Sequence, residues 1–429
     1  MRLTLNNLNI RGVRFGPSTA IDDHVLSIDR EELIELLTEE PLFDRVEVEL
    51  ATPGESCRII NVLDVVEPRC RLQGSNFPGA LDPMGLVGEG ETRVLKNVLV
   101  VETSQMPLAG FTKGGRSIID MRGPATVYSP FGGKHNIVLV PHPAPAANEE
   151  RYRLAVKRAG LRTAVYLAES TKETTPDETQ LYELPAVAHN QGPPELPRIC
   201  YVFPIHSQQR PTHQEEAVLY GSNVHGLLPT VVHPNEILDG ALIFAFAALT
   251  YHAQNQPVIE ELYRRHGHDL WFAGVVLTLA PVTFAEKERN AQLAARLAKE
   301  VLGASGVITT KIGGGAVDTD LMLIHDRCAD LGMKTVPIIM ERYPDTGITF
   351  VPPNVKTLVS PGLTRDAITL PSVKRVIGGD SVVVDNRDPD NTSPSVPPVP
   401  ADQELRVWMG DIVGAISQVG ASRLTTYQG

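Results

Sequence analysis

A polar cluster that follows the longest apolar run of the sequence has the residue types to hold a small polar ligand. The run, residues 241–249, contains only Ala, Leu, Ile and Phe. It is far shorter than the roughly twenty residues that cross a bilayer, so we expect buried core. Gln254 and Asn255 come next, just before Pro257, which suits the first turn of a helix. The cluster is therefore a candidate substrate site, although a core segment followed by an ordinary helix cap has the same spacing.

A second candidate site is the glycine-rich segment IGGGAVDTD, residues 312–320. Glycines such as Gly313 and Gly314 let backbone amides approach a ligand closely, and Asp318 would cap the helix that follows. Asp318 and Asp320 could hold a cation or a substrate ammonium group. The segment has neither the Lys-Ser/Thr of a Walker loop nor a GxGxxG pattern. A glycine turn followed by an ordinary N-cap is an equally simple interpretation.

The histidines and cysteines give little support for metal chemistry. The histidines that could gather are not spaced as HExxH or another strict metal pattern; they are His206, His213, His225 and His233. We therefore assign no metal ligand, and a metal-dependent hydrolase is the least favoured function. The four cysteines contain no CxxC pair, so we expect free, buried thiols without an assigned role; they are Cys57, Cys70, Cys200 and Cys328.

Composition limits the possible partners and the compartment. The chain has 429 residues, 42% hydrophobic and 21% charged, which is typical of a soluble protein of two or three domains. Its net charge of −12 argues against nucleic acid or an anionic membrane as partner. The N-terminus lacks a charged region followed by an apolar one, so we expect no signal peptide and a cytoplasmic protein.

The first half of the chain predicts a β-rich N-terminal domain, residues 1–145, and an α/β connecting region, residues 146–232. Runs rich in Val and Ile indicate strands at 45–50, 58–65 and 94–101, and Asp29 caps a short helix. In the connecting region we expect a helix from Asn148 that leads into a strand at 164–169, and a second strand at 199–203.

Residues 233–384 predict a doubly wound, Rossmann-like α/β domain. Strands from 273, 306 and 334 alternate with helices at 284–302 and 318–331, a pattern that requires a parallel sheet with right-handed crossovers. Ligands of such sheets bind beyond the carboxyl ends of the strands, where Glu341 would lie. A Pro-rich linker at 385–403 then leads to an amphipathic helix at 404–429, which would dock on its own chain or on a partner subunit.

The chain resembles a known family, the precursors of the α and β subunits of component B of glycine, sarcosine and betaine reductases, which are related to the D-proline reductase precursor. The resemblance reaches to about Gly379 and rests on nine motifs in the same order. They are VRFG, PGESCRIINVLDVVEPR, SIIDMRGPA, the Tyr220-Gly221 pair, LPTVVHPNEILDGAL, NQPVIEELY, EKER, DTDLM and ITLPSVKRVIGG.

The resemblance implies a substrate-binding subunit that works with a selenocysteine- or cysteine-bearing partner in the reductive cleavage of a C–N bond in an amine or amino acid. Processed members of the family cut themselves at a cysteine that becomes a pyruvoyl group, a carbonyl that can draw electrons from the bond to be broken. That cysteine is absent from residues 241–249, and Thr250 is the one nearby hydroxyl, without an evident base. We therefore expect an uncut chain without a pyruvoyl cofactor.

Two interpretations of the missing cysteine remain open. In the first, the chain is an active subunit of an oligomeric complex, and the thiol or selenol of the partner reacts with a substrate that needs no Schiff base. In the second, it is a binding or scaffold subunit without catalysis. Polar residues at the central stretch (Asp239, Gln254, Asn255) and at the sheet edge (Asp318, Asp320, Glu341) slightly favour the first.

Overall fold

The computed structural model of the chain describes residues 1–106, 117–208, 218–244, 248–341, 355–383 and 398–428. Its N-terminal part is rich in strands, as the sequence predicts. Two four-stranded sheets that mix parallel and antiparallel pairs carry most of it, in the orders β13-β1-β9-β8 and β5-β12-β10-β7. Their strands are β1 (Arg2–Asn9), β5 (Phe43–Ala51), β7 (Val62–Val66), β8 (Arg69–Arg71), β9 (Gly90–Lys96), β10 (Val98–Thr103), β12 (His135–Pro143) and β13 (Glu178–Glu183).

Smaller elements complete this part of the chain. The predicted helix is α1 (Arg30–Thr38), and the Asp29 carboxylate accepts hydrogen bonds from two of its first backbone amides. Two three-stranded sheets have the orders β2-β4-β3 and β11-β6-β21. Their strands are β2 (Gly12–Phe15), β3 (Ala20–Asp22), β4 (Val25–Ile28), β6 (Cys57–Ile59), β11 (Ile119–Asp120) and β21 (Arg375–Ile377).

Two of the predicted strands are each divided in the structure. The run 58–65 splits into β6 and β7 around Asn61, and the run 94–101 splits into β9 and β10 around Asn97. Both asparagines have positive φ, 58° and 66°, a conformation that Asn tolerates better than most residues. The chain therefore changes sheets at each asparagine, and the apolar run alone did not reveal it.

The strand predicted at 164–169 is wrong. The segment is the last part of α2 (Glu149–Glu169), one continuous helix whose Asn148 side chain caps its start. Ala164, Val165, Leu167 and Ala168 are buried against the N-terminal sheets, so the segment continues the apolar face of the helix.

The strands predicted from 199, 273, 306 and 334 form the parallel core of a five-stranded sheet. Its order is β15-β16-β14-β17-β18, and only β15 is antiparallel. These strands are β14 (Arg198–Ser207), β15 (Thr230–Val232), β16 (Trp271–Ala280), β17 (Gly306–Thr309) and β18 (Lys334–Pro337).

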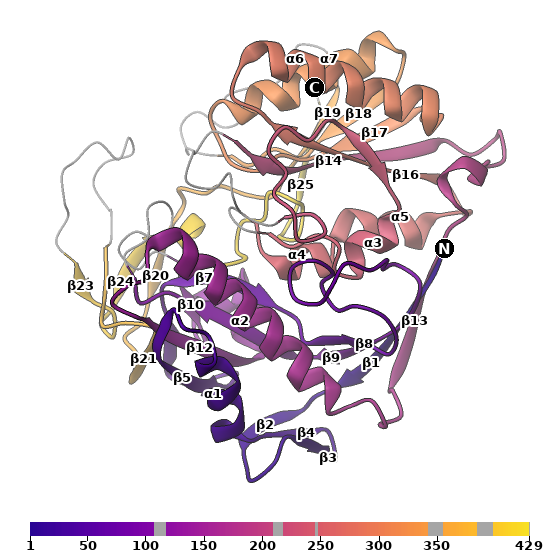
Figure 1. The fold of residues 1–429 in the computed structure, drawn as a ribbon. Coiled ribbons are helices and arrows are strands. Elements are labelled where there is room, and N and C mark those ends of the chain that lie inside the picture. Colours follow the sequence, from indigo (N-terminus) through magenta and orange to yellow (C-terminus); the bar gives the residue numbers. More distant parts are fainter. Residues whose placement is uncertain (107–116, 209–217, 245–247, 342–354, 384–397, 429) are drawn as a thin grey trace.

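Helices cover both faces of this sheet (Figure 1). On one face lie α6 (Phe284–Arg296), which continues as a π-helical turn at Leu297–Val301, and α7 (Val317–Asp330). The other face contacts α3 (Pro234–Leu238), α4 (Thr250–Gln254) and α5 (Pro257–Arg265), which separate the sheet from the N-terminal part. The fold is thus mixed α/β with one mostly parallel sheet, while the Rossmann-like assignment stays a prediction.

The helix predicted at 404–429 is wrong. The segment forms β24 (Leu405–Trp408), a 3-10 turn at Met409–Asp411 and β25 (Thr425–Gln428). Burial alternates along it, with Leu405, Val407 and Met409 buried, because β24 pairs with β20 (Ala367–Leu370). Gly414 breaks any helical continuation, since its φ is +78° and a Cβ there would lie 2.5 Å from Phe131.

The remaining strands pair with one another within the C-terminal part of the chain, and Arg58 connects that part to the N-terminal region. β19 (Thr357–Ser360) pairs with β25, and β22 (Ser381–Val382) pairs with β23 (Val399–Pro400). The fully buried Arg58 donates hydrogen bonds to the carbonyls of Ala401 and Gln403, so the end of the predicted linker is fixed to β6.

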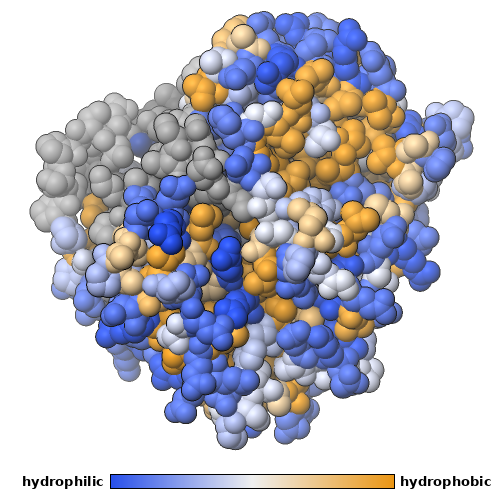
Figure 2. Space-filling view, viewed as in Figure 1, coloured by the Kyte–Doolittle hydropathy of each residue, from blue (hydrophilic) through white to orange (hydrophobic). Residues whose placement is uncertain are grey.

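Surface and thiol properties follow from this packing. On the face shown in Figure 2, apolar residues gather over the five-stranded sheet, whereas polar residues dominate over the N-terminal part. None of the described helices is long and apolar enough to span a membrane. All four cysteines are free and buried, as expected, and burial raises the pKa of the Cys57 and Cys70 thiols to about 11.

Candidate functional site

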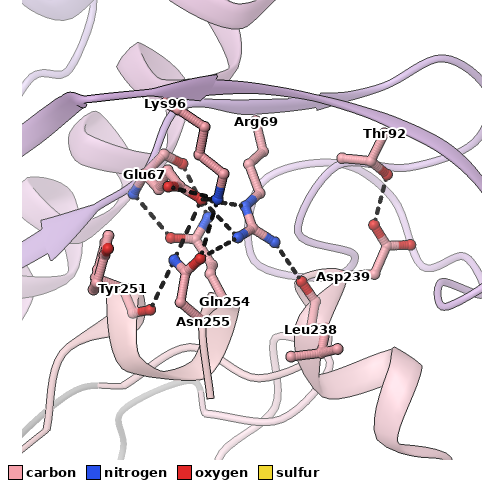
Figure 3. Close-up of polar contacts among 9 residues, drawn as sticks. All are labelled: Glu67, Arg69, Thr92, Lys96, Leu238, Asp239, Tyr251, Gln254 and Asn255. Atoms are coloured by element: carbon pink, nitrogen blue, oxygen red, sulfur yellow. Dashed lines mark hydrogen bonds and ion pairs between the residues drawn. The ribbon is translucent and has the colours of Figure 1, made fainter. Parts of the chain in front are cut away.

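A cluster of buried charges lies where α4 meets the N-terminal sheets, and Glu67 is at its centre (Figure 3). Its carboxylate accepts hydrogen bonds from Arg69 Nη2 at 2.6 Å and Nε at 3.0 Å, and from Lys96 Nζ at 3.1 Å. Glu67 follows β7, Arg69 begins β8 and Lys96 ends β9, so three strand ends place these side chains together.

Two of the predicted site residues, Gln254 and Asn255, belong to this cluster. The side-chain amide of Gln254 pairs with the backbone of Glu67. It accepts a hydrogen bond from the Glu67 N–H at 2.9 Å and donates one to the Glu67 carbonyl at 3.0 Å. Asn255 Oδ1 accepts from Arg69 at 3.1 Å and from Lys96 at 3.3 Å. The polar end of the central stretch therefore contacts β-strand residues of the N-terminal part, and not the glycine loop.

The electrostatics of the cluster favour a charged Glu67. Burial alone would raise the pKa of its carboxyl, but the charges and hydrogen bonds of Lys96 and Arg69 lower that pKa to about 2. Two further half-buried charges act on the same groups. Burial raises the pKa of Glu260, against the effect of Lys96 and Arg69. Burial lowers the pKa of Lys134, against the attraction of Glu67.

The third predicted residue of the central stretch, Asp239, lies beside Arg69. Its carboxylate accepts hydrogen bonds from the Gly88 N–H at 2.8 Å and the Thr92 hydroxyl at 2.7 Å, and it forms an ion pair with Arg71. A small hollow with room for about one water molecule borders this carboxylate. Its lining consists of Arg69, Arg71, Asn76, Phe77, Thr92, Asp239, Gly240 and Gln254.

Thr250 lies beside a carboxylate that the sequence did not indicate. Its hydroxyl and its backbone N–H both donate to the carboxylate of Asp64, the latter at 2.8 Å, and the hydroxyl accepts from the Phe244 N–H at 3.2 Å. Asp64 in turn forms an ion pair with Lys157 of α2. Lys157 also contacts Glu102 at 3.1 Å, a carboxyl whose pKa burial raises to about 8.

Each aspartate of the glycine-rich segment forms an ion pair with a lysine. Asp318 forms an ion pair with Lys311, and Asp320 forms one with Lys287 of α6. Both lysines are buried, at 4% exposure each. Burial raises the pKa of Asp320 to about 6, although Lys287 opposes this effect. The EKER and DTDLM motifs thus meet in one ion pair, Lys287 with Asp320, at the start of α6 and α7.

The glycines of this segment face the C-terminal part of the chain. The Gly313 N–H donates to the side-chain carbonyl of Gln418 at 2.7 Å, and Gly313 has a φ of +94° that other residues adopt at a cost. Glu341 lies on that side as well, where it accepts hydrogen bonds from Ser360 at 2.6 Å and Tyr427 at 3.1 Å. The predicted site residues therefore fall into three groups, around Arg69, around the lysine pairs and around Glu341.

Glu67, Arg69, Arg71 and Lys96 were not among the predicted site residues, although a signal for three of them exists in the sequence. Glu67, Arg69 and Arg71 alternate with Pro68 and Cys70 directly after an apolar strand. Charges at every second position of a strand lie on one face, so a buried face of this kind must pair them with another element. Among the described residues, no three His, Cys, Asp or Glu side chains are grouped as metal ligands; His213 lies outside those residues.

Comparisons with known proteins agree with the resemblance in the motifs. A family model described as glycine/sarcosine/betaine reductase component B subunits matches residues 1–427. The chain is 33% identical to the glycine reductase complex component B subunits alpha and beta of Acetoanaerobium sticklandii, over 99% of both chains. No solved structure matches it.

Further relatives cover most of the chain too. It is 34% identical to the sarcosine reductase complex component B subunit alpha of Peptoclostridium acidaminophilum, over 88% of this chain and 89% of the relative. The betaine reductase complex component B subunit alpha of that organism is 30% identical over 88% of each. The D-proline reductase proprotein PrdA is distant, at 23% identity over 79% of this chain and 54% of the relative. On this evidence the chain belongs to the glycine/sarcosine/betaine reductase component B family.

Proposed function

We propose that the chain is the substrate-binding subunit of a complex that cleaves a C–N bond reductively, and that it works uncut and without a pyruvoyl group. A partner subunit bearing a thiol or selenol would carry the reacting atom. The names of the relatives, each a component B subunit of a reductase complex, support the assignment to such a complex.

The composition of the central stretch carries the uncut part of the proposal. Backbone self-cleavage needs a side-chain thiol or hydroxyl to take the acyl group of the preceding residue, and residues 241–249 have neither. Thr250 follows them, but its hydroxyl donates to Asp64 and accepts from Phe244. Because Asp64 binds both the hydroxyl and the N–H of Thr250, it acts as the missing cap of α4, whose N-cap residue, Leu249, has no side-chain hydrogen bond.

The same contact defines the opposing hypothesis. A carboxylate that accepts a hydrogen bond from a hydroxyl is also in the position that a general base would occupy. If Asp64 activated Thr250, the chain would be cut before residue 250. The ion pair of Asp64 with Lys157 favours the structural role, because the carboxylate then joins α2 to the start of α4 through contacts with both Lys157 and Thr250.

The chemistry of the proposed substrate needs no carbonyl on this subunit. A quaternary amine of the betaine type cannot form a Schiff base, so its C–N bond must be activated in another way, and a partner thiol or selenol supplies a nucleophile. We propose that Gln254 and Asn255, with Asp239, shape the substrate site from one side. Asp318 and Asp320 would orient the cationic group, which requires a substrate to displace Lys311 or Lys287 from its aspartate.

The alternative is a scaffold subunit whose polar groups serve only folding. Reconstitution separates the two functions: the purified chain is combined with a thiol- or selenol-bearing partner subunit and a reductant, and the release of amine from glycine, sarcosine and betaine is measured. An active subunit makes release depend on this chain. If a partner binds but no amine is released from any of the three, the scaffold function is correct.

A further inference from the structure

The order of the parallel strands gives the five-stranded sheet a topological switch point between β14 and β17. Along the chain, β16 is added on one side of β14, and the chain then crosses to the other side to add β17 and β18. Open parallel sheets bind ligands outside the carboxyl ends of their strands at such a point. Because β17 ends at Thr309, shortly before the glycine-rich segment 312–320 begins, this segment lies where the sheet would bind a ligand.

Residues 412–420, which we call the C-terminal strap, contact the glycine-rich segment at this place. The strap follows the 3-10 turn at Met409–Asp411. The Gln418 side-chain carbonyl accepts a hydrogen bond from the Gly313 N–H at 2.7 Å. The Val419 backbone carbonyl accepts one from the Gln256 side chain at 3.4 Å. An acceptor of the chain itself therefore occupies a backbone donor of the glycine-rich segment.

Apolar contacts of the strap cover the same end of the sheet. Val419 is fully buried, in the hydrophobic cluster that also contains Ile312 and Ile338. Ile338 follows β18 directly, and Ile312 comes shortly after β17. Gly420 lies against the same side chain, because a Cβ at Gly420 would be 3.3 Å from Ile338 Cδ1. The strap thus covers the carboxyl ends of β17 and β18, and a ligand that approaches the glycine-rich segment from that side must displace it.

The strap is anchored on both sides of the part that covers the sheet. Near its start, the Val413 N–H donates to the Ile118 carbonyl at 2.9 Å, and the Val413 carbonyl accepts from the Ser129 hydroxyl at 2.6 Å. Beyond its end, the Ser422 hydroxyl donates to the Pro361 carbonyl at 2.9 Å, and β25 pairs with β19. These anchors allow the middle of the strap to move while its two ends stay in place.

The middle of the strap also has hinge residues and an unsatisfied group. The backbone is left-handed at Gly414 and Gly420, with φ of +78° and +90°, and glycine absorbs the backbone rotation of a hinge at little cost. Between them, Ser417 is 3% exposed, and its hydroxyl makes no hydrogen bond to the described residues. Because a buried hydroxyl without a partner costs free energy, opening of the strap gains a hydrogen bond to water there.

From these observations we propose that the C-terminal strap is an autoinhibitory lid, which Gln418 holds closed over the switch point and which opens when the substrate binds beside the glycine-rich segment. The inference rests on the proposed function, in which Asp318 and Asp320 of this segment orient the cationic group. It deepens that function by giving the site a regulated entrance. The apparent affinity for the substrate is then reduced by the fraction of chains whose strap is open.

Calorimetric titration of the full-length chain with sarcosine tests the strap. Gln418→Ala removes the acceptor for the Gly313 N–H and should bind sarcosine about 2- to 10-fold more tightly than the wild type, the shift expected when one hydrogen bond holds the closed state. A merely structural role of Gln418 would leave the affinity unchanged or lower it. Gln403→Ala, which truncates an exposed glutamine outside the strap, is the matched control and should keep wild-type affinity. The proposal is overturned if the Gln418 variant binds sarcosine no more tightly than the wild type.

A second measurement needs no substitution, so it holds even if the variant fails to fold. Hydrogen exchange of the wild type, followed by mass spectrometry, is compared with and without saturating sarcosine. Sarcosine should speed the exchange of the amides of residues 415–420 and slow the exchange of the amides of residues 313–318. Closure of a segment over a bound ligand would slow both. Unchanged or slower exchange in the strap with bound sarcosine would overturn the proposal.

The outcomes separate this inference from the proposed function. Tighter sarcosine binding by Gln418→Ala, in a chain that supports no amine release with any partner, would leave the strap correct and the proposed function wrong. Amine release from a complex whose Gln418→Ala variant has unchanged KM for sarcosine would do the reverse.

Discussion

The Thr250 hydroxyl donates a hydrogen bond to the Asp64 carboxylate, across 186 positions of the sequence. Thr250 is fully buried and Asp64 is 1% exposed. The contact joins the start of α4 to β7 and so fixes the central stretch to the N-terminal sheets. Among the described residues of the central stretch, it also places a hydroxyl beside a carboxylate.

If the contact is structural, Thr250→Val will lower stability and change nothing else. The substitution keeps the shape but removes the hydroxyl, and it leaves a buried carboxylate oxygen and the Phe244 N–H without that partner. We expect the free energy of unfolding to fall by about 1–3 kcal/mol, measured by urea denaturation. Thr369→Val, at an exposed strand position, is the control and should change it by less than about 0.5 kcal/mol. Equal stability of the two variants would contradict a structural role.

Glu67→Gln should be among the most destabilising single substitutions in the cluster. It removes the carboxylate that Arg69 and Lys96 share, and Arg69 is too buried to find water instead. A loss of about 3–5 kcal/mol is expected when one partner of a buried ion pair is removed. Glu261→Gln on α5 breaks an exposed pair with Arg264 and should cost less than about 1 kcal/mol. A comparable loss in both variants would mean that burial does not determine how much these ion pairs contribute to the free energy of unfolding.

The raised pKa of Glu102 predicts a pH dependence of stability. Its pKa in the folded chain, about 8, lies above the ordinary value of 4.5. Between these pH values the folded state holds a proton that the unfolded state has lost, so stability falls as pH rises through this window. Glu102→Gln should flatten that slope, as followed by thermal unfolding between pH 5 and 8, a range taken within the window above. The exposed Glu150→Gln serves as control, and an unchanged slope in the Glu102 variant would refute the assignment.

Substitution of the aspartates tests their proposed role toward the cationic group. If Asp318 and Asp320 orient an ammonium group, Asp318→Asn and Asp320→Asn should weaken sarcosine binding about tenfold, as expected for a charged hydrogen bond. Calorimetry on the full chain measures the affinity of each variant for sarcosine. Unchanged sarcosine binding in both variants would assign the two aspartates to folding alone, as partners of Lys311 and Lys287.

The sequence predicted the elements whose pattern is local. The strands from 273, 306 and 334 and the helices between them were correct, because apolar strands and capped amphipathic helices alternate there. The prediction for the C-terminal segment was wrong, since Leu405, Trp408 and Met409 have helical spacing. Leu405, Val407 and Met409 alternate as in a strand, and only pairing with β20 decides between the two patterns. Strand pairing of this kind is a tertiary effect that single-sequence periodicity does not contain.

The candidate site could be predicted only in part for the same reason. Gln254, Asn255 and Asp239 were selected because they are polar residues beside a buried stretch. Their partners Glu67, Arg69 and Arg71 are more than 140 positions away, and only the folded chain brings them together. The Asp64 carboxylate beside Thr250 could not be predicted either, because it comes from β7, far from Thr250 in sequence.

The measurement that tests the central claim most directly is the mass of the denatured, purified chain. The account predicts a single species at 46.7 kDa, the mass of the uncut chain. Two fragments that meet before Thr250 would contradict it, would make Asp64 the base of a self-cleavage reaction, and would restore a carbonyl-dependent mechanism.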